Sequence, residues 1–332
     1  MMINFYSVTS TKRSTLLLQI LLVIGLGFSF SVSATYPEKP IKLIVPFSPG
    51  GGTDLVARTV AEGMSRDLNQ SVVVENKPGA GTVIGTDYVV KSAPDGYTLI
   101  VATFAQAVNP SLIKNMPYVA SRDLIPVAMV GNSPNVLVVL PNSEFKSIAD
   151  VIAYAKKNPG KLTYASQGNG TSAHLAGELF TSLAQVEMVH IPYKGASQAI
   201  TDLLGGQVSM SFATASAAAN LVGAGKLRAL AVTTKERSAG WPKTPTMIEA
   251  GVKDYYMESW YGIFAPVGTP KEIVDRLNKA VLQSTKTSYF STRLADEGLM
   301  AKPGSPESFG QYVANEEARW QKIIQNAKIK LD

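Results

Sequence analysis

The chain has 332 residues, enough for two domains, and 45% of them are hydrophobic and 17% charged, which is a globular composition. It contains no cysteine, which excludes a disulfide scaffold, a cysteine nucleophile and thiolate metal sites. The formal net charge is +6, and the basic residues are scattered and form no run of the kind that binds nucleic acid. We therefore expect only a weak general attraction for anionic ligands.

The first 34 residues have the three parts of a secretory signal peptide. Lys12 and Arg13 precede the apolar run Leu16–Phe30, and Val32-Ser33-Ala34 is a small-x-small cleavage site. The apolar run is shorter than the roughly 20 residues of a spanning helix, so a membrane anchor is the weaker interpretation. With no cysteine to carry a lipid, we expect cleavage near Ala34 and a soluble periplasmic protein without a lipid anchor.

Short apolar runs alternate with amphipathic stretches in the first part of the mature chain. The pattern predicts strands at Ile41–Val45, Ser71–Glu75 and Thr98–Ala102, and helices at Asp54–Leu68 and Thr82–Lys91. This βαβαβ order with short connections predicts a parallel sheet with helices on both faces.

A second run of the same kind begins near Asn135. Its predicted strands are Val136–Leu140, Leu162–Ala165, Met188–Ile191, Val208–Phe212 and Leu227–Val232. Its predicted helices run from a capping box of Ser147 and Asp150 to Lys157, and over Ser172–Ala184, Gly195–Leu204 and Ala215–Gly223.

The C-terminal part predicts a strand at Ser259–Ala265 and two helices. Thr269–Glu272 is a predicted capping box with Pro270 at the first helical position, and the helix that begins there is expected to end near Thr285. Ser305-Pro306 begins a predicted final helix that ends near Ala327. The final helix has a predicted buried stripe of Phe309, Tyr312, Val313, Trp320 and Ile324. We interpret this part as completing the first domain, so that two α/β lobes, residues 35–133 plus 257–332 and residues 134–256, enclose a ligand cleft.

The segment Pro46–Asp54 joins the first strand to the first helix and contains three consecutive glycines. Glycines let backbone N–H groups approach a ligand closely, and the N-terminus of the helix adds a partial positive charge. A turn capped by Thr53 or Asp54 is the alternative, but three glycines exceed what a turn needs. We predict a binding loop, which is not a Walker loop because no Gly-Lys-Ser/Thr follows.

The segment Ser166–His174 also joins a strand to a helix and matches G-x-G-x-x-A, a weak sign of a dinucleotide site. The next strand ends in Pro192-Tyr193-Lys194, where a ribose-binding acid would stand. We therefore favour a second anion-binding loop, in which hydroxyl groups lie beside free N–H groups, over a dinucleotide site or a plain helix cap.

The chain has two histidines, His174 and His190, which are a poor zinc set without cysteine. No G-x-S-x-G elbow and no H-E-x-x-H motif occurs. A dyad of Ser166 and His174 is conceivable, but no motif supplies a third orienting group. We expect supporting roles for both histidines and no catalysis, cofactor or metal.

Seven short segments, spread in order over nearly the whole mature chain, form a distinctive set. They are PFSPGGGTD at 46–54, ENKPGAG at 75–81, DGYTL at 95–99, PYKG at 192–195, GKLRALAV at 225–232, WYG at 260–262 and APVGTP at 265–270. Together they resemble the Bug family, the extracytoplasmic solute receptors of tripartite tricarboxylate transporters.

The resemblance implies a type II periplasmic-binding-protein fold that holds a di- or tricarboxylate, an acidic amino acid or an aromatic acid such as nicotinate or terephthalate. It implies that the glycine-rich loop and the loop after Ser166 bind carboxylate through N–H groups, hydroxyls and water. Many members carry an acid where this chain has Ala213-Thr214, which puts amino-acid binding in doubt. The expected ligand-binding residues are Phe47, Ser48, Gly50, Gly51, Gly52, Thr53, Phe104, Gln106, Ser166, Asn169, Gly170, Thr171, Ser172, Tyr193, Lys194, Ala213 and Thr214.

We therefore expect a periplasmic solute-binding protein that captures a small organic carboxylate for membrane permease subunits, as a monomer and without a cofactor. A carboxylate sensor that feeds a signalling partner is one alternative. A secreted serine hydrolase or a dehydrogenase is the other.

Overall fold

The computed structural model describes residues 1–3, 36–295, 298–326 and 329. The chain divides into two units, Met1–Glu38 and Lys39–Asp332, and the elements named below belong to the second. The expected signal peptide lies almost wholly outside the described residues. In the described part of the chain, no helix is long and apolar enough to cross a membrane.

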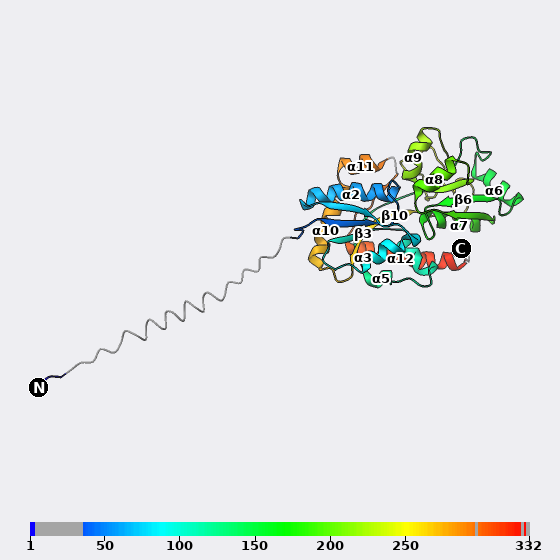
Figure 1. The fold of residues 1–332 in the computed structure, drawn as a ribbon. Coiled ribbons are helices and arrows are strands. Elements are labelled where there is room, and N and C mark those ends of the chain that lie inside the picture. Colours follow the sequence, from blue (N-terminus) through cyan, green and yellow to red (C-terminus); the bar gives the residue numbers. More distant parts are fainter. Residues whose placement is uncertain (4–35, 296–297, 327–328, 330–332) are drawn as a thin grey trace. The chain divides into compact units, whose positions relative to one another are not determined.

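A six-stranded sheet with the order β11-β4-β10-β3-β1-β2 forms the first lobe (Figure 1). Its strands are β1 (Ile41–Val45), β2 (Val72–Asn76), β3 (Thr98–Thr103), β4 (Leu124–Ser133), β10 (Ser259–Pro266) and β11 (Met300–Ala301). Strand β1 pairs in parallel with β2 and β3, whereas β10 runs antiparallel between β3 and β4. The helices of this lobe are α2 (Gly52–Leu68), η1 (Ala80–Thr82), α3 (Val83–Val90), α4 (Ala105–Leu112), α5 (Ala120–Asp123), α10 (Lys271–Thr285), α11 (Ser288–Ala295) and α12 (Pro306–Asn326).

A five-stranded sheet with the order β7-β6-β8-β5-β9 forms the second lobe. Its strands are β5 (Asn135–Val139), β6 (Leu162–Ser166), β7 (Met188–Pro192), β8 (Met210–Thr214) and β9 (Arg228–Val232). Its helices are α6 (Ile148–Lys157), α7 (Ser172–Ala184), α8 (Ala196–Leu204) and α9 (Ala215–Gly223). The parallel pairing expected for this run holds between β6 and its neighbours β7 and β8, but β5 is antiparallel to both β8 and β9.

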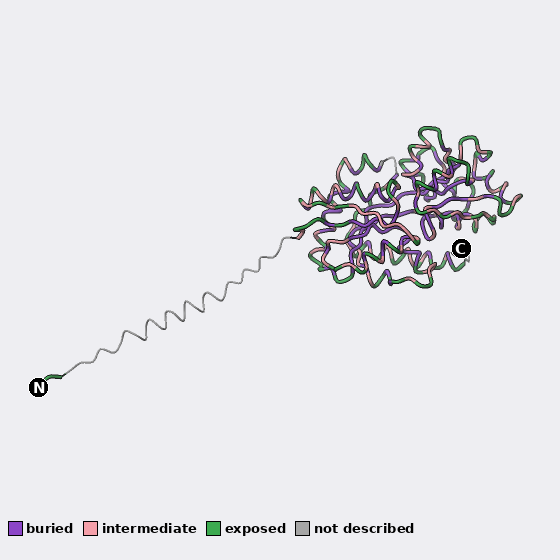
Figure 2. The backbone as a smooth tube through the Cα atoms, viewed as in Figure 1, coloured by how far each residue is buried: buried purple, intermediate pink, exposed green. Residues whose placement is uncertain are grey.

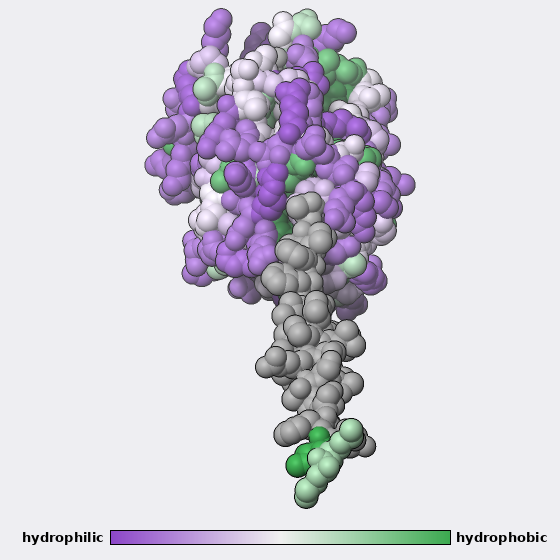
Figure 3. Space-filling model, turned by 90° about the vertical axis from the view of Figure 1, so that its left-hand side faces the viewer, coloured by the Kyte–Doolittle hydropathy of each residue, from purple (hydrophilic) through white to green (hydrophobic). Residues whose placement is uncertain are grey.

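The central strands of both sheets are buried, as the purple stretches in Figure 2 show. All eight residues of β10 and all five of β5 are buried, because helices cover both faces of each sheet. On the face of the second unit seen in Figure 3, hydrophilic residues predominate and apolar residues are scattered. This distribution is usual for a protein surface in contact with water.

The predicted helix ends differ in their outcome. The capping box of α6 is confirmed: the Ser147 hydroxyl accepts the N–H of Asp150, and the Asp150 carboxylate accepts the N–H of Ser147. The capping box predicted before α10 is wrong. Its N-cap residue is Pro270, which has no side-chain acceptor, and the Thr269 hydroxyl donates to the carbonyl of Pro266 at 2.9 Å.

The chain passes between the two sheets twice. A single residue, Pro134, separates β4 from β5, and residues 233–258 lead from β9 back to β10. The two passages are tied together, since the N–H of Asn135 donates to the Thr233 hydroxyl at 2.9 Å and the N–H of Thr233 donates to the Asn135 carbonyl at 3.0 Å. The sheets thus define two lobes, while the residue boundaries of 134 and 257 stay a prediction.

Candidate ligand-binding site

A cavity of about 390 Å³ is lined by loops of both lobes. The first lobe contributes the loop after β1, the turn around η1 and one residue after α4, and the second lobe contributes the loops after β6 and β7. Ligands of α/β sheets generally bind beyond the carboxyl ends of the strands, where these loops lie. The lining residues are Pro46, Phe47, Gly79, Ala80, Gly81, Thr82, Ile113, Gln167, Gly168, Asn169, Pro192, Tyr193 and Lys194.

The turn Gly79–Thr82 has a left-handed backbone at four consecutive residues. Their φ angles are +132°, +47°, +59° and +83°, and two of the four, Ala80 and Thr82, are not glycine. Non-glycine residues adopt such angles at an energetic cost, which proteins accept mostly at functional sites. Backbone turns with these conformations can present N–H groups to an anion.

Asp54 holds the glycine-rich loop in place. Its carboxylate accepts the N–H of Gly50 at 3.1 Å, the Nδ2 group of Asn76 at 2.9 Å and the guanidinium of Arg58 at 2.9 Å. Burial alone would raise the pKa of Asp54, but these hydrogen bonds and the charge of Arg58 bring it below its ordinary value. Asn76 also donates to the carbonyl of Phe47 at 3.0 Å, so the loop is tied to β2 as well as to α2.

The three glycines of this loop pack against the second lobe. A Cβ atom on Gly52 would lie 2.0 Å from Ser216 Oγ, and one on Gly51 would lie 3.8 Å from the Cβ atom of Ala196. The Ser48 hydroxyl donates to the carbonyl of Lys194 at 3.2 Å. The loop is therefore a contact between the lobes, close to the cavity that Phe47 lines.

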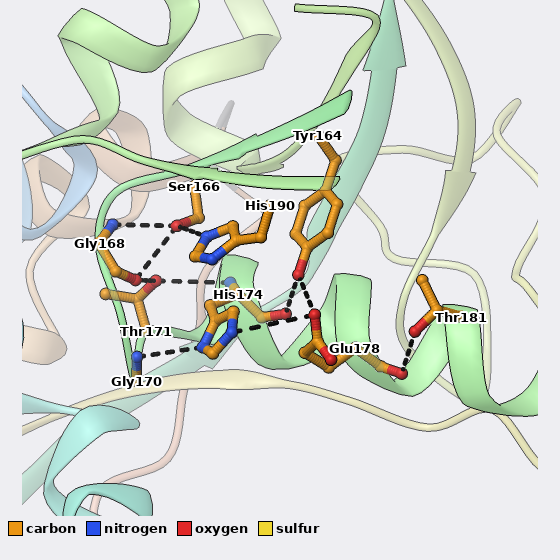
Figure 4. Close-up of polar contacts among 9 residues, drawn as sticks. All are labelled: Tyr164, Ser166, Gly168, Gly170, Thr171, His174, Glu178, Thr181 and His190. Carbon is orange, nitrogen blue, oxygen red and sulfur yellow. Dashed lines mark hydrogen bonds and ion pairs between the residues drawn. The ribbon is translucent and has the colours of Figure 1, made fainter. Parts of the chain in front are cut away.

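The hydroxyls of Ser166 and Thr171 bond within their own loop (Figure 4). Ser166 Oγ lies 3.1 Å from both the nitrogen and the oxygen of Gly168, and the Thr171 hydroxyl donates to the Gly168 carbonyl at 2.6 Å. Thr171 is also the N-cap residue of α7, and both side chains are buried. These hydroxyls shape the loop that carries Asn169 into the cavity wall.

Ser166 pairs with His190 and not with His174. Ser166 Oγ lies 2.6 Å from His190 Nε2, whereas His174 Nδ1 accepts the N–H of Gly170 at 3.2 Å. The conceivable dyad of Ser166 and His174 is therefore wrong. Burial lowers the pKa of His190 to about 4, so this ring is neutral at pH 7.

Four of the expected ligand-binding residues line the cavity, namely Phe47, Asn169, Tyr193 and Lys194. Two others lie apart from it: Phe104 packs edge-on against Trp320 in the core, and Gln106 lines a separate pocket of about 210 Å³. The remaining expected residues flank the lining at the lobe contact, in the loop after β6 or at the end of β8, and their ligand roles stay predictions. They are Ser48, Gly50, Gly51, Gly52, Thr53, Ser166, Gly170, Thr171, Ser172, Ala213 and Thr214.

Most of the first lobe's share of the wall was not predicted from the sequence. No ligand role was predicted for Ile113 or for the turn Gly79–Thr82, whereas Pro46, Gln167 and Gly168 belong to the two predicted binding loops without being among the expected contact residues. The segment ENKPGAG already contained the available signal, because Gly79 and Gly81 follow a strand within a few residues, as the three glycines do in the loop at residue 50.

The cavity wall is largely apolar with a single charge. Among the described residues that line it, Lys194 alone is charged, and its side chain is exposed. The Tyr193 hydroxyl donates to Asp202 at 2.6 Å, and burial together with this bond raises the pKa of Tyr193 to about 12. No group of three or more His, Asp or Glu side chains in the described part of the chain can hold a metal ion. The arrangement suits a small organic anion held mostly by neutral groups.

Comparison with known proteins agrees with this geometry. Residues 56–329 match the model of the tripartite tricarboxylate transporter family receptor. The protein BugT of Bordetella pertussis is 38% identical over 321 residues, which cover 94% of this chain and 98% of BugT.

Two solved structures superpose closely. An R. palustris protein with adipate has a TM-score of 0.86 and 36% identity, covering 89% of this chain and 99% of that one. MatC from Rhodopseudomonas palustris with bound malate has a TM-score of 0.83 and 31% identity, covering 87% of this chain and all of MatC. With its two α/β lobes of the type II periplasmic-binding-protein fold, the chain belongs to the Bug family of tripartite tricarboxylate transporter receptors.

Proposed function

We propose that this protein is an exported periplasmic receptor that binds a small organic carboxylate between its lobes and delivers it to the permease subunits of a tripartite tricarboxylate transporter. The observation that carries the proposal is the cavity of about 390 Å³ lined by both lobes, with one cation and backbone turns from each lobe in its wall. The family relationship and the relatives that hold adipate and malate support it.

The carboxylate is held mainly by neutral donors. An anion that leaves water must have its hydrogen bonds replaced, and the lining offers the turn Gly79–Thr82, the amides of Gln167 and Asn169, and Lys194. The apolar area contributed by Phe47, Ile113 and Tyr193 fits the carbon frame of an aliphatic or aromatic acid. Ala213 and Thr214 offer no carboxylate for a ligand ammonium group, which favours acids without an amino group.

A ligand screen by thermal shift tests the proposal. The protein is unfolded, dialysed and refolded to remove carried ligand, then heated with malate, adipate, citrate, nicotinate, terephthalate or glutamate. A ligand that binds only the folded state raises the melting temperature. At a ligand concentration of a hundred times Kd, the free energy of unfolding increases by about 2.7 kcal/mol. We expect a shift with at least one acid and none with neutral sugars. A shift with sugars alone would refute carboxylate binding.

The role in export and transport has its own measurements. N-terminal sequencing of the secreted protein should begin near Thr35, and a protein retained with Leu16–Phe30 in the membrane fraction would contradict export. Capture from detergent-solubilised membranes should recover permease subunits when the ligand is present. Recovery of a sensor kinase alone would favour the signalling alternative.

The contact of Ser166 with His190 is the one observation that favours a hydrolase. We propose binding without catalysis, because Ser166 Oγ is buried and already bonded to Gly168, so a substrate carbonyl has no approach to it. An ester-hydrolysis assay with the wild type and Ser166→Ala should give the same background rate. Turnover that disappears with this substitution would restore the enzyme hypothesis.

A further inference from the structure

Two histidines lie directly beneath the loop that forms the second lobe's wall of the cavity (Figure 4). His174 comes from the first turn of α7 and His190 from β7, and their rings stack with centroids 4.2 Å apart and an interplanar angle of 20°. Tyr164 of β6 stacks on His190 as well, at 4.9 Å. The rings thus form a small stack, fixed by three elements, behind the loop and outside the cavity lining.

Each histidine supports one of the two glycines that flank Asn169. His190 reaches Gly168 through Ser166, whose Oγ lies 2.6 Å from His190 Nε2 and 3.1 Å from the Gly168 nitrogen. His174 reaches Gly170 directly, because its Nδ1 accepts the Gly170 N–H at 3.2 Å. Both glycines have positive φ angles, +132° and +72°, which glycine adopts without strain, and these hydrogen bonds tie the loop to the histidines in that conformation.

Asn169 takes part both in the cavity lining and in the contact between the lobes. Asn169 lines the cavity, and its carbonyl faces the turn of the first lobe, where a Cβ atom on Gly81 would lie 2.5 Å from the Asn169 oxygen. On the neighbouring residue, a Cβ atom at Gly170 would lie 2.2 Å from Asn109 Oδ1 of α4. A small shift of this loop therefore changes the cavity and the contact between the lobes together.

The hydrogen bond from the Gly170 N–H to His174 Nδ1 determines which ring nitrogen of His174 carries a proton. Nδ1 must carry no proton, so the ring is the neutral tautomer with hydrogen on Nε2. Nε2 lies 4.0 Å from Glu178 Oε1, which also accepts the Tyr164 hydroxyl at 2.6 Å. The ring is thus flanked by Glu178 of the same helix and by the stacked ring of His190 of β7. The Tyr164 hydroxyl of β6 donates to the His174 carbonyl at 3.4 Å.

We propose that His174 is a positioning residue of the ligand site: its neutral ring, stacked on His190, holds Gly170 through Nδ1 and thereby sets Asn169 in the cavity wall. The inference deepens the proposed carboxylate-binding function and rests on it. It assigns His174 no contact with the ligand. The hydrogen bond to Gly170, and not the volume of the ring, is the property that binding requires.

Two substitutions at position 174 separate these properties. His174→Asn keeps an acceptor near the place of Nδ1, whereas His174→Leu keeps similar bulk without an acceptor and leaves the buried Gly170 N–H unpaired. Calorimetry with adipate and with malate should show affinity weakened about tenfold or more in His174→Leu, and affinity within about threefold of wild type in His174→Asn. Equal losses in both variants, or wild-type affinity with leucine, would overturn the proposal.

Stability and ligand identity are controlled separately. Ser147→Ala destabilises the same lobe at α6, away from the cavity, so it shows what a loss of stability alone does to affinity. Because the chain has only two histidines, ¹⁵N spectra of the rings resolve both without ambiguity. We expect His174 Nδ1 to be unprotonated at pH 7 and bonded to the Gly170 amide. This measurement needs no ligand, so a protonated Nδ1 refutes the inference even if no carboxylate binds, and a failed screen alone counts only against the proposed function.

Discussion

Lys194 shows how the balance of charges in the cavity can be tested at a single residue. Its exposed ammonium group is screened by water, so an ion pair there contributes only about 0.2–1 kcal/mol. We expect Lys194→Ala to weaken binding of the acid identified in the thermal-shift screen less than about fivefold. Thr171→Ala, which removes the hydroxyl that holds the Gly168 carbonyl, should weaken it about tenfold. Calorimetry on both variants, with the exposed Lys226→Ala as a control, decides the matter. Complete loss of binding in Lys194→Ala alone would make a salt bridge the anchor.

His190 makes the stability of the fold depend on pH. Its pKa is about 4 in the folded protein and about 6.5 in an unfolded chain. Between these values the unfolded state binds a proton that the folded state does not, so the free energy of unfolding falls as the pH is lowered from about 6.5 to about 4. His190→Gln removes this contribution. Its melting temperature should therefore fall less than that of the wild type between about pH 7.5 and about pH 4.5, and parallel curves would contradict the assigned burial.

The site residues that sequence reasoning found and those that it missed differ in a physical way. Phe47, Tyr193 and Lys194 lie two or three residues beyond the ends of predicted strands, where the topology alone brings loops together. Ser166 and Thr171 were assigned to the ligand because their hydroxyls are good donors, but the structure uses both hydroxyls within the loop. The turn Gly79–Thr82 could not be assigned, because its role depends on backbone angles that non-glycine residues rarely adopt and on the loop facing it from the other lobe.

At the scale of elements, the capping box of α6 offers a clean measure of local stability. Ser147 and Asp150 satisfy two N–H groups that the helix itself leaves unpaired. Ser147→Ala should lower the free energy of unfolding by about 1 kcal/mol. Urea unfolding followed by circular dichroism measures this change. The affinity for the acid identified in the thermal-shift screen should be unchanged, because α6 does not line the cavity. An unchanged midpoint would mean that water replaces the cap without cost.

The elements themselves were predictable where one face is apolar and the ends are marked. Helices α7 and α9 were predicted with their observed bounds, and the tail strand β10 indeed joins the first sheet. Strand β4 was missed, because Pro126 and Gly131 interrupt its pattern and its partner β10 lies more than a hundred residues away in sequence. The antiparallel direction of β5 was missed too, since alternation of side chains is the same in either direction.

At the scale of the whole molecule, glycines on the first lobe permit a close contact with the second lobe that larger residues would block. Gly81 lies against the carbonyl of Asn169, and Gly52 lies against Ser216. The two passages between the sheets cross beside each other at Asn135 and Thr233, where small rotations of the chain can change the angle between the lobes. We therefore expect the two lobes to close when a ligand binds.

Gly81→Ala tests closure directly. A Cβ atom there would lie 2.5 Å from the backbone oxygen of Asn169, so the lobes of the variant cannot meet as they do here. The residue also has a φ of +59°, and alanine at such an angle is strained in any position. Gly160→Ala is the matched control, because its φ is +68° and a Cβ atom there meets nothing within 4 Å. Gly160→Ala therefore introduces the same kind of backbone strain but no steric contact with the other lobe.

Small-angle scattering of refolded, ligand-free protein, with and without a saturating amount of the acid identified in the thermal-shift screen, measures the result. The radius of gyration should fall on binding in the wild type and in Gly160→Ala, because both can bring the lobes together. In Gly81→Ala it should fall less, and the affinity measured by calorimetry should drop about tenfold or more, because a steric clash at a packed contact costs on the order of 1–3 kcal/mol. If Gly81→Ala compacts and binds as the control does, the contact of Gly81 with Asn169 plays no part in closure, and the ligand is held by a more open arrangement of the lobes.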